Sequence, residues 1–137
     1  MLRISYLLDY GLGSPIGWQV HTQTVTPERV INDVADCRTF LLEEEAVELQ
    51  RQGLGARTKV TDLLVFGKAG PIGNRLRHAN EPARHKILDV LGDLALLGQD
   101  LCGHLVAYRS GHPLNVELVR VLRRQLPETS DTLRRAA

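Results

Sequence analysis

The chain has 137 residues, of which 43% are hydrophobic and 24% charged, and its formal net charge is +1. This length and composition suit one domain with a real core, but not comfortably two. The near-neutral charge gives no broad electrostatic case for binding nucleic acid or an anionic membrane. One tryptophan, three tyrosines and two phenylalanines are too few for base-stacking platforms. No stretch approaches the ~20 apolar residues of a membrane span, so we expect neither a nucleic-acid partner nor a membrane span.

The cysteines and the N-terminus bear on the compartment. Cys37 and Cys102 are the only cysteines and show no CxxC spacing, which suits reduced thiols better than a disulfide framework. Residues 1–10 contain no long apolar run and no small-residue cleavage site, so we expect no signal peptide. These features favour a cytoplasmic protein.

The first third of the chain predicts two strands followed by a helix. Residues 2–10 and 18–25 alternate in polarity as strands do, and a glycine-rich turn separates them. Thr26 then reads as a helix N-cap, and Pro27 occupies the first helical position. One face of this helix is expected to carry Val30, Ile31, Val34 and Ala35.

A small strand–helix–strand unit is expected next. Residues 38–42 predict a short strand and residues 43–52 a helix that Gly53 ends. Ala46, Val47 and Leu49 are expected to pack inward from this helix. Residues 61–66 have the composition of a strand, and residues 67–80 predict a long loop.

The last part of the chain predicts a helix, a strand and a second helix. Asn80 is expected to cap the first helix and Gly98 to end it, before a strand over residues 101–108 and a helix over about 113–125. Residues 127–137 read as a polar tail. We therefore predict one α+β domain over residues 1–126: a two-layer sandwich of a β-sheet with helices packed on one face, with a small βαβ insert at about 40–66.

The helix that follows Asn80 carries an unusual set of side chains. At roughly 100° per residue, four ionisable residues share one arc of about 100°: His85, Lys86, Asp89 and Asp93. Apolar residues cover most of the remaining circumference, which is typical of a buried helix. Ionisable groups on such a helix must be paired or bound to a metal, because desolvating an unpaired charge is costly. The ionisable edge therefore indicates part of a site.

His85 and Asp89 are four residues apart, so their side chains project from neighbouring turns. An imidazole and a carboxylate at this spacing can ligate one divalent ion, and zinc suits nitrogen-plus-oxygen ligation. Two ligands are not a complete zinc site. On spacing alone, a histidine and an aspartate hydrogen-bonded to each other in the core is the better interpretation.

The neighbouring polar residues also allow two interpretations each. Asp93 can orient an imidazole from elsewhere or form an ordinary cap or salt bridge, and Lys86 can serve the site or snorkel to the surface. His112 follows Ser110-Gly111 at a helix start, where the helix dipole favours neutral imidazole. A carboxylate such as Asp93 would instead favour imidazolium, which can act as an acid or stabilise an oxyanion. Alone, a histidine after glycine is an ordinary loop residue.

Three other residues have weaker cases. Thr39 could donate its hydroxyl to a carbonyl oxygen, but one threonine is not diagnostic. His21 and His104 lie in strand-like segments, so we expect them to be structural or exposed.

Several short motifs occur here in a characteristic order and spacing: Arg38-Thr39-Phe40, Gly53-Leu54, Asn74-Arg75-Leu76-Arg77, Glu81, Arg84-His85-Lys86-Ile87-Leu88-Asp89, Gly92-Asp93-Leu94, Ser110-Gly111-His112 and Leu114-Asn115. Over about residues 38–122 they resemble the second domain of the UDP-3-O-acyl-N-acetylglucosamine deacetylase family. That family comprises the zinc amidases that commit bacteria to lipid A synthesis. The patterns H-K-x-L-D-x-x-G-D and S-G-H-x-L-N are specific enough together to outweigh the structural interpretations above.

The resemblance implies a zinc cofactor and a role for each matching residue. His85 and Asp89 resemble two of the family's three zinc ligands. His112 is similar to the cationic histidine that stabilises the developing oxyanion, and Asp93 to the carboxylate that orients it. Zinc would lower the pKa of a bound water and polarise the acetamide carbonyl.

The resemblance also implies contacts with a UDP-linked acylated amino sugar. Lys86 resembles a lysine near the substrate, and Thr39 the hydroxyl that polarises the scissile carbonyl. Phe40 resembles a hydrophobic substrate contact, and the unit at about 40–66 resembles the insert that forms the acyl-chain passage. Arg109 stands where a lysine commonly contacts the nucleotide diphosphate.

The departures from the family are as informative. The family enzyme has two similar domains, and its third zinc ligand and its glutamate base belong to the first, which nothing here resembles. Residues 55–58, Pro82 and Leu41-Leu42 differ from the usual residues, which affects the shape of the passage rather than the residues facing the zinc.

Two interpretations of different class follow. In the first, the chain is one half of a deacetylase, either one domain of a longer protein or a separately encoded subunit. A first domain, missing here or carried by a partner polypeptide, supplies the remaining ligand and base, and the chain is inactive alone. In the second, it is a non-catalytic interaction or regulatory module that keeps the fold. Retention of His85, Asp89, Asp93 and His112 weighs against the second, since a relic has no need for costly ionisable groups.

Overall fold

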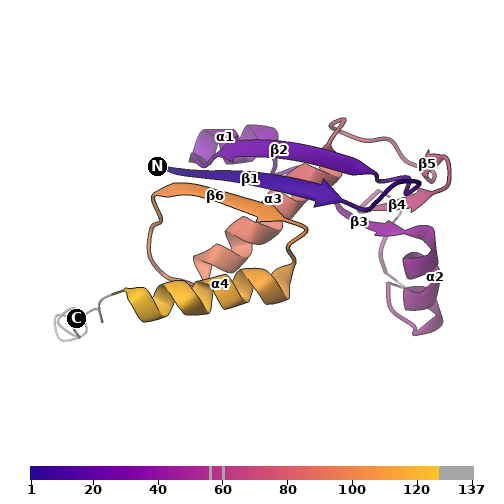
Figure 1. Cartoon of the computed structure of the whole chain (residues 1–137). Helices are drawn as coiled ribbons and strands as arrows, with labels where there is room; N and C mark the ends of the chain where they lie inside the picture. Colours follow the sequence, from indigo (N-terminus) through magenta and orange to yellow (C-terminus); the bar gives the residue numbers. More distant parts are fainter. Residues whose placement is uncertain (56, 60, 127–137) are drawn as a thin grey trace.

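Figure 1 shows the computed structural model of the chain, which describes residues 1–55, 57–59 and 61–126. The elements in chain order are β1 (Leu2–Asp9), β2 (Trp18–Thr24), α1 (Pro27–Asp33), β3 (Thr39–Leu42), α2 (Glu43–Arg51), β4 (Leu63–Gly67), β5 (Gly70–Pro71), α3 (Glu81–Ala95), β6 (Gly103–Tyr108) and α4 (His112–Gln125). The polar tail expected over residues 127–137, and Ala56 in the departing stretch 55–58, lie outside the described residues.

The main layer is a three-stranded sheet in the order β2-β1-β6, with β1 antiparallel to β2 and parallel to β6. Helix α3 packs against β1 and β2, and α4 lies against α3 (Figure 1). Ile4, Tyr6 and Leu8 alternate along β1 and are at most 3% exposed, as are Ile87 and Val90 of α3. The predicted α+β class, with helices packed on a sheet, is confirmed.

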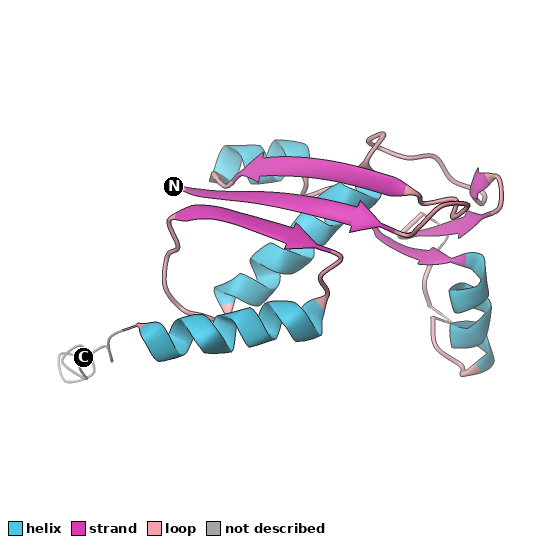
Figure 2. Cartoon of the chain, in the orientation of Figure 1, coloured by secondary structure: helices cyan, strands magenta, loops and turns pink. Residues whose placement is uncertain are grey.

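The insert forms a second three-stranded sheet in the order β3-β4-β5 (Figure 2). Strands β3 and β4 are parallel and α2 connects them, which gives the expected βαβ order. The loop expected over residues 67–80 contains the short strand β5, which returns antiparallel to β4. Gly70 has a φ of 113° at this tight return, a conformation that glycine adopts without steric cost.

The apolar face of α1 is only partly buried, and the predicted inward packing of α2 is wrong in part. Ile31 is 68% exposed and Ala35 is exposed, while the fully buried residue is Val34, just past the end of α1. Val47 of α2 is 59% exposed, and no residue of α2 is buried. Both helices are short and lie at the periphery (Figure 1), so each packs only a narrow strip against its sheet.

The two predicted N-caps have different outcomes. The Oγ1 atom of Thr26 accepts a hydrogen bond from the Arg29 N–H at 3.3 Å, so the cap of α1 is confirmed. Asn80 is at the cap position of α3, but its side chain makes no capping hydrogen bond. It donates to the Val20 carbonyl and accepts from Arg84 Nε, so it ties α3 to β2 instead.

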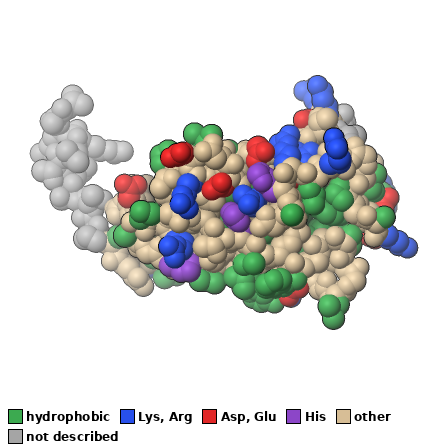
Figure 3. Space-filling model, turned by 90° about the horizontal axis from the view of Figure 1, so that it is seen from above, with side chains coloured by type: hydrophobic (Ala, Val, Ile, Leu, Met, Phe, Trp, Pro, Cys, Tyr) green, Lys and Arg blue, Asp and Glu red, His purple; other side chains and the backbone are tan. Residues whose placement is uncertain are grey.

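Three further observations bear on the predictions from composition. Cys37 and Cys102 are both free thiols. Within the described part of the chain, no helix has the length and apolar character to cross a membrane. On the face seen in Figure 3, acidic, basic and histidine side chains are interspersed, so no single sign of charge dominates it.

Candidate functional site

Helix α3 lies with its ionisable edge at the border between core and solvent. The side chains of His85, Lys86, Asp89 and Asp93 are 13–17% exposed. On the opposite side of the same helix, Val90 and Leu94 are at most 5% exposed. The helix is therefore held by its apolar face, and the edge is accessible from one side.

His85 is held by contacts on both ring nitrogens. Its Nδ1 atom lies 3.1 Å from the carbonyl oxygen of Cys37, which can only accept, so Nδ1 donates. Its Nε2 atom lies 3.3 Å from Asp89 Oδ1 and 3.3 Å from Thr39 Oγ1. This arrangement places Nε2 toward Asp89 and Thr39.

The pair fits a tetrahedral zinc ion. Two nitrogen or oxygen ligands at normal zinc distances lie about 3.3 Å apart, which matches the separation of 3.3 Å between His85 Nε2 and Asp89 Oδ1. A ligating histidine typically donates its other N–H to a carbonyl or carboxylate, as His85 does to Cys37. Among the described residues, no third histidine, cysteine or carboxylate completes a group of ligand atoms with this pair.

Asp93 brings a second imidazole to the same helix. His112 Nδ1 lies 2.9 Å from Asp93 Oδ2, so the contact expected between Asp93 and an imidazole is present. His112 is the first residue of α4 and its side chain is 65% exposed. The amide of Asn115 donates to the same carboxylate oxygen at 2.8 Å. Asn115 therefore fixes Asp93, a role that sequence reasoning missed although Asn115 belongs to the quoted motif.

Lys86 and Arg109 line one pocket of about 280 Å³, together with Tyr6 and Ser110. The ammonium of Lys86 lies 2.7 Å from Asp89 Oδ2, so Asp89 contacts both Lys86 and His85. Among the described residues, Arg109 is the only non-glycine with a positive φ, 49°. That conformation costs roughly 1–2 kcal/mol, and a hydrogen bond from the Arg109 N–H to the Leu7 carbonyl holds it.

Tyr6 is a further residue of this pocket that sequence reasoning did not single out. It is 1% exposed, and its hydroxyl donates to the carbonyl of Ser110. Burial raises the pKa of this hydroxyl, which keeps it a donor. The inward alternation along residues 2–10 was the available signal. Tyr6 thereby fixes the turn that leads from β6 to His112.

Phe40 and Thr39 are neighbours with different surroundings. Phe40 is 7% exposed and belongs to the core, where its ring meets the His85 ring edge-on at 6.1 Å. Thr39 is exposed and contacts His85 Nε2. The structure therefore places Phe40 beneath the His85 ring and Thr39 at the open side of it.

A larger pocket of about 600 Å³ lies in the insert between β3, α2 and β4. Its lining includes the apolar side chains of Leu41, Ala46, Leu49 and Val65. Thr39, which contacts His85, also lines this pocket. The pocket therefore adjoins the ionisable edge of α3. The apolar residues of α2 are thus directed to a pocket rather than to the core.

A buried ion pair joins β3 to α3. Glu81 is 0% exposed and accepts from Arg38 Nε at 2.9 Å and from Arg38 Nη2 at 3.1 Å. Burial opposes the charged form of Glu81, but the hydrogen bonds from Arg38 and from the N–H groups of Arg77 and Arg38 outweigh it, so the pKa of Glu81 is lowered. The pair sets the start of β3, and hence Thr39, next to α3.

The fold and this edge define an α+β domain with paired imidazole and carboxylate groups beside an apolar pocket. A model of the UDP-3-O-acyl N-acetylglycosamine deacetylase family matches residues 1–124. The chain belongs to this family.

Relatives named UDP-3-O-acyl-N-acetylglucosamine deacetylase share about two-fifths of the aligned residues. The protein of Chlamydia abortus is 41% identical over 120 residues, which is 87% of this chain and 43% of the relative. That of Chlamydia felis is 40% identical over 126 residues, 91% of this chain and 45% of the relative. The chain therefore spans less than half the length of these relatives.

Proposed function

We propose that the chain is the second half of a zinc-dependent deacetylase that hydrolyses the N-acetyl amide of a UDP-linked acylated amino sugar in lipid A biosynthesis. The single observation that carries this proposal is the pair formed by His85 and Asp89. Their ligand atoms are 3.3 Å apart, and the other ring nitrogen of His85 is tied to a carbonyl. Family membership supports the reaction class.

The residues of the edge have distinct roles in this proposal. Zinc held by His85 and Asp89 would supply a Lewis acid that polarises the amide carbonyl and makes a water molecule more acidic. His112, oriented by Asp93, stabilises the developing oxyanion and gives a proton to the leaving amine. Thr39 donates its hydroxyl to the carbonyl oxygen.

Two pockets suit the two ends of the substrate. The apolar pocket of the insert takes the acyl chain. Each methylene buried there favours binding by about 0.8 kcal/mol. The smaller pocket is lined by Arg109, whose charge suits the diphosphate, and by Lys86, which lies near the substrate, together with Asp9. Phe40 acts through the position of the His85 ring, against which it packs.

A partner completes the site. The third zinc ligand and the general base come from a first domain, carried by a partner polypeptide or by a longer form of this chain, in keeping with a sequence that spans 43% of a relative. Leu114 and Val121 of α4 are 60% and 39% exposed and lie two turns apart, on the helix that begins at His112. Both side chains are open to contact with such a first domain. The cytoplasmic location stays a prediction.

Mixing the two halves tests the proposal. The purified chain alone should not hydrolyse a UDP-linked acylated amino sugar, and addition of a first-domain polypeptide should produce turnover. His85→Ala and His112→Ala should each abolish most of that turnover. Unchanged rates in both variants would refute the proposed function, as would full activity of the isolated chain.

A further inference from the structure

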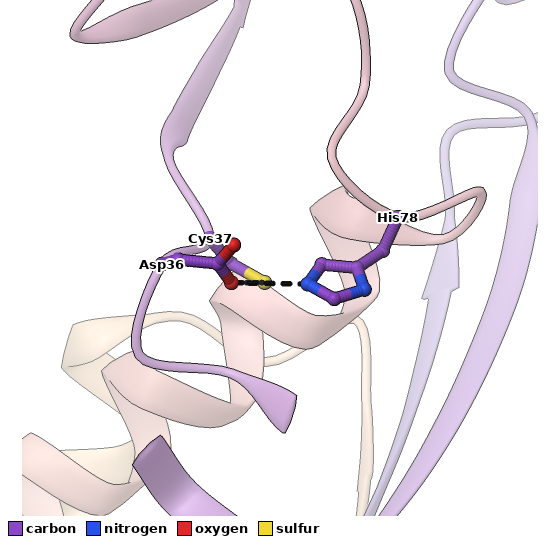
Figure 4. Close-up of side chains that lie close together, drawn as sticks. All are labelled: Asp36, Cys37 and His78. Atoms are coloured by element: carbon purple, nitrogen blue, oxygen red, sulfur yellow. Dashed lines mark hydrogen bonds and ion pairs between the residues drawn. The ribbon is translucent and has the colours of Figure 1, made fainter. Parts of the chain in front are cut away.

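A second cluster of ligand-type side chains lies outside the ionisable edge of α3. Asp36 and Cys37 lie between α1 and β3, and His78 lies in the loop before α3 (Figure 4). One ligand atom from each of the three residues lies within 4.8 Å of the others. In the described part of the chain, this is the only such group of three. Nothing in the proposed deacetylase reaction uses it.

The backbone on both sides of this cluster is fixed by one buried carboxylate. Glu81 accepts hydrogen bonds from the N–H of Arg38, next to Cys37, and from the N–H of Arg77, next to His78. The Arg77 guanidinium also donates to the main-chain carbonyl of Asp36. These hydrogen bonds hold two segments, about 40 residues apart in sequence, in a fixed position relative to each other. The three side chains therefore converge before any ion binds.

We propose that Asp36, Cys37 and His78 form a second cation site, which takes a zinc-type ion with water as the fourth ligand. Cysteine, histidine and aspartate together match the ligand preferences of zinc. Oxygen and nitrogen ligands of a tetrahedral zinc lie about 3.3 Å apart, and sulfur and oxygen ligands about 3.5 Å apart. The corresponding separations are 3.0 Å from Asp36 Oδ1 to His78 Nε2 and 3.8 Å from Cys37 Sγ to Asp36 Oδ1.

Access and charge both suit this ion. Cys37 is 7% exposed and forms the floor of the site, whereas the Asp36 side chain is 51% exposed and leaves an entry for the ion and its water. The Cys37 thiol loses its proton to solvent as the metal–sulfur bond forms. One thiolate and one carboxylate then balance the two positive charges of the ion.

The two metal sites meet at Cys37. Its side chain faces the second site, and its carbonyl accepts the hydrogen bond from His85 Nδ1 at 3.1 Å. An ion bound to Cys37 would therefore restrain the residue that orients His85. The second site acts as a structural clip that steadies the ionisable edge.

Cobalt(II) titration of the purified chain tests this site, because a thiolate ligand gives a near-ultraviolet charge-transfer band that imidazole and carboxylate ligands do not. The Cys102→Ser variant, which keeps Cys37, should develop this band, and zinc should displace the cobalt. Cys37→Ser should lack the band, and His78→Ala should bind cobalt about tenfold or more weakly. Circular dichroism checks that each variant is folded.

Absence of the band in folded Cys102→Ser would overturn the second site, leaving only a hydrogen-bonded histidine–aspartate pair. The same holds if the band persists in Cys37→Ser, because Cys102 would then be the ligand. A second readout is the melting temperature, which zinc should raise by more in Cys102→Ser than in the double variant lacking both cysteines.

Discussion

The main-chain carbonyl of Cys37 accepts a hydrogen bond from His85 Nδ1 at 3.1 Å. This contact joins the end of the α1–β3 connection to the second turn of α3, and the two residues are 48 positions apart. His85 Nδ1 is the donor in this contact, because a carbonyl cannot donate. The Nε2 atom then faces Asp89 and Thr39, which is the orientation that our proposal needs of a metal ligand.

Metal binding at the edge of α3 should depend on the missing half. In a Cys37→Ser background, which removes the thiolate of the second site, the isolated chain should bind zinc weakly, because His85 and Asp89 provide only two ligands. Addition of a first-domain polypeptide should strengthen binding, and His85→Gln should abolish that gain. Calorimetry with zinc alone measures both effects. Tight binding by the isolated variant would contradict the two-ligand site.

His112→Ala should separate function from stability. The His112 side chain is 65% exposed, so its removal should change the free energy of unfolding by less than about 0.5 kcal/mol. In the completed deacetylase the same change should lower the turnover rate about 10²–10⁴-fold, as loss of a general acid does. His104→Ala is the matched control, since His104 is exposed on β6 and hydrogen-bonded to Ser5. Equal rates in the two variants would remove His112 from the chemistry.

The site was predictable from the sequence where its geometry is local. His85 and Asp89 are one helical turn apart, so their proximity follows from the helix itself. The contact between Asp93 and His112 spans 19 residues and was expected through the family resemblance rather than through spacing. By contrast, the carbonyl of Cys37 reaches His85 only because β3 packs beside α3, and no local pattern encodes that.

In the fold, as in the site, local patterns were predictable from the sequence and packing between distant segments was not. The alternation of Ile4, Tyr6 and Leu8 predicts the buried face of a central strand, because it depends only on the period of a strand. The inward packing of Val47 was predicted wrongly, since an apolar stripe does not reveal that its helix lies at the periphery. Burial there depends on what packs over the helix, which is a property of the whole fold.

Glu81→Gln should destabilise the chain strongly. The Arg38 guanidinium would remain buried opposite a neutral amide, and breaking a buried pair costs about 3–5 kcal/mol. The pKa of Glu81 is lowered from its ordinary value of 4.5. The stability that its charge contributes is therefore present above pH 4.5 and lost as the pH falls through the lowered pKa. Urea unfolding at neutral and acidic pH measures both effects.

Glu48→Gln is the control for this prediction, because Glu48 pairs with Arg51 on the surface of α2. The Glu48→Gln substitution should change the free energy of unfolding by less than about 1 kcal/mol. A Glu81→Gln variant as stable as this control, with an unchanged acid transition, would show that the buried pair does not hold β3 against α3.

Ala46→Phe should shorten the apolar pocket of the insert. Ala46 lines that pocket from α2, so a phenyl ring there would occupy space meant for acyl methylenes. Loss of two methylene contacts costs about 1.6 kcal/mol, which is more than tenfold in affinity. Binding of a fluorescent long-chain fatty acid to the chain measures this loss, and a shorter probe should be affected less.

Glu44→Phe is the matched control, because it places the same ring on α2 at an exposed position outside the pocket lining. This variant should bind both probes as the unmodified chain does. Equal weakening by the two variants would mean that the probe binds an apolar surface of α2 and not the pocket, and the acyl-chain assignment would fail.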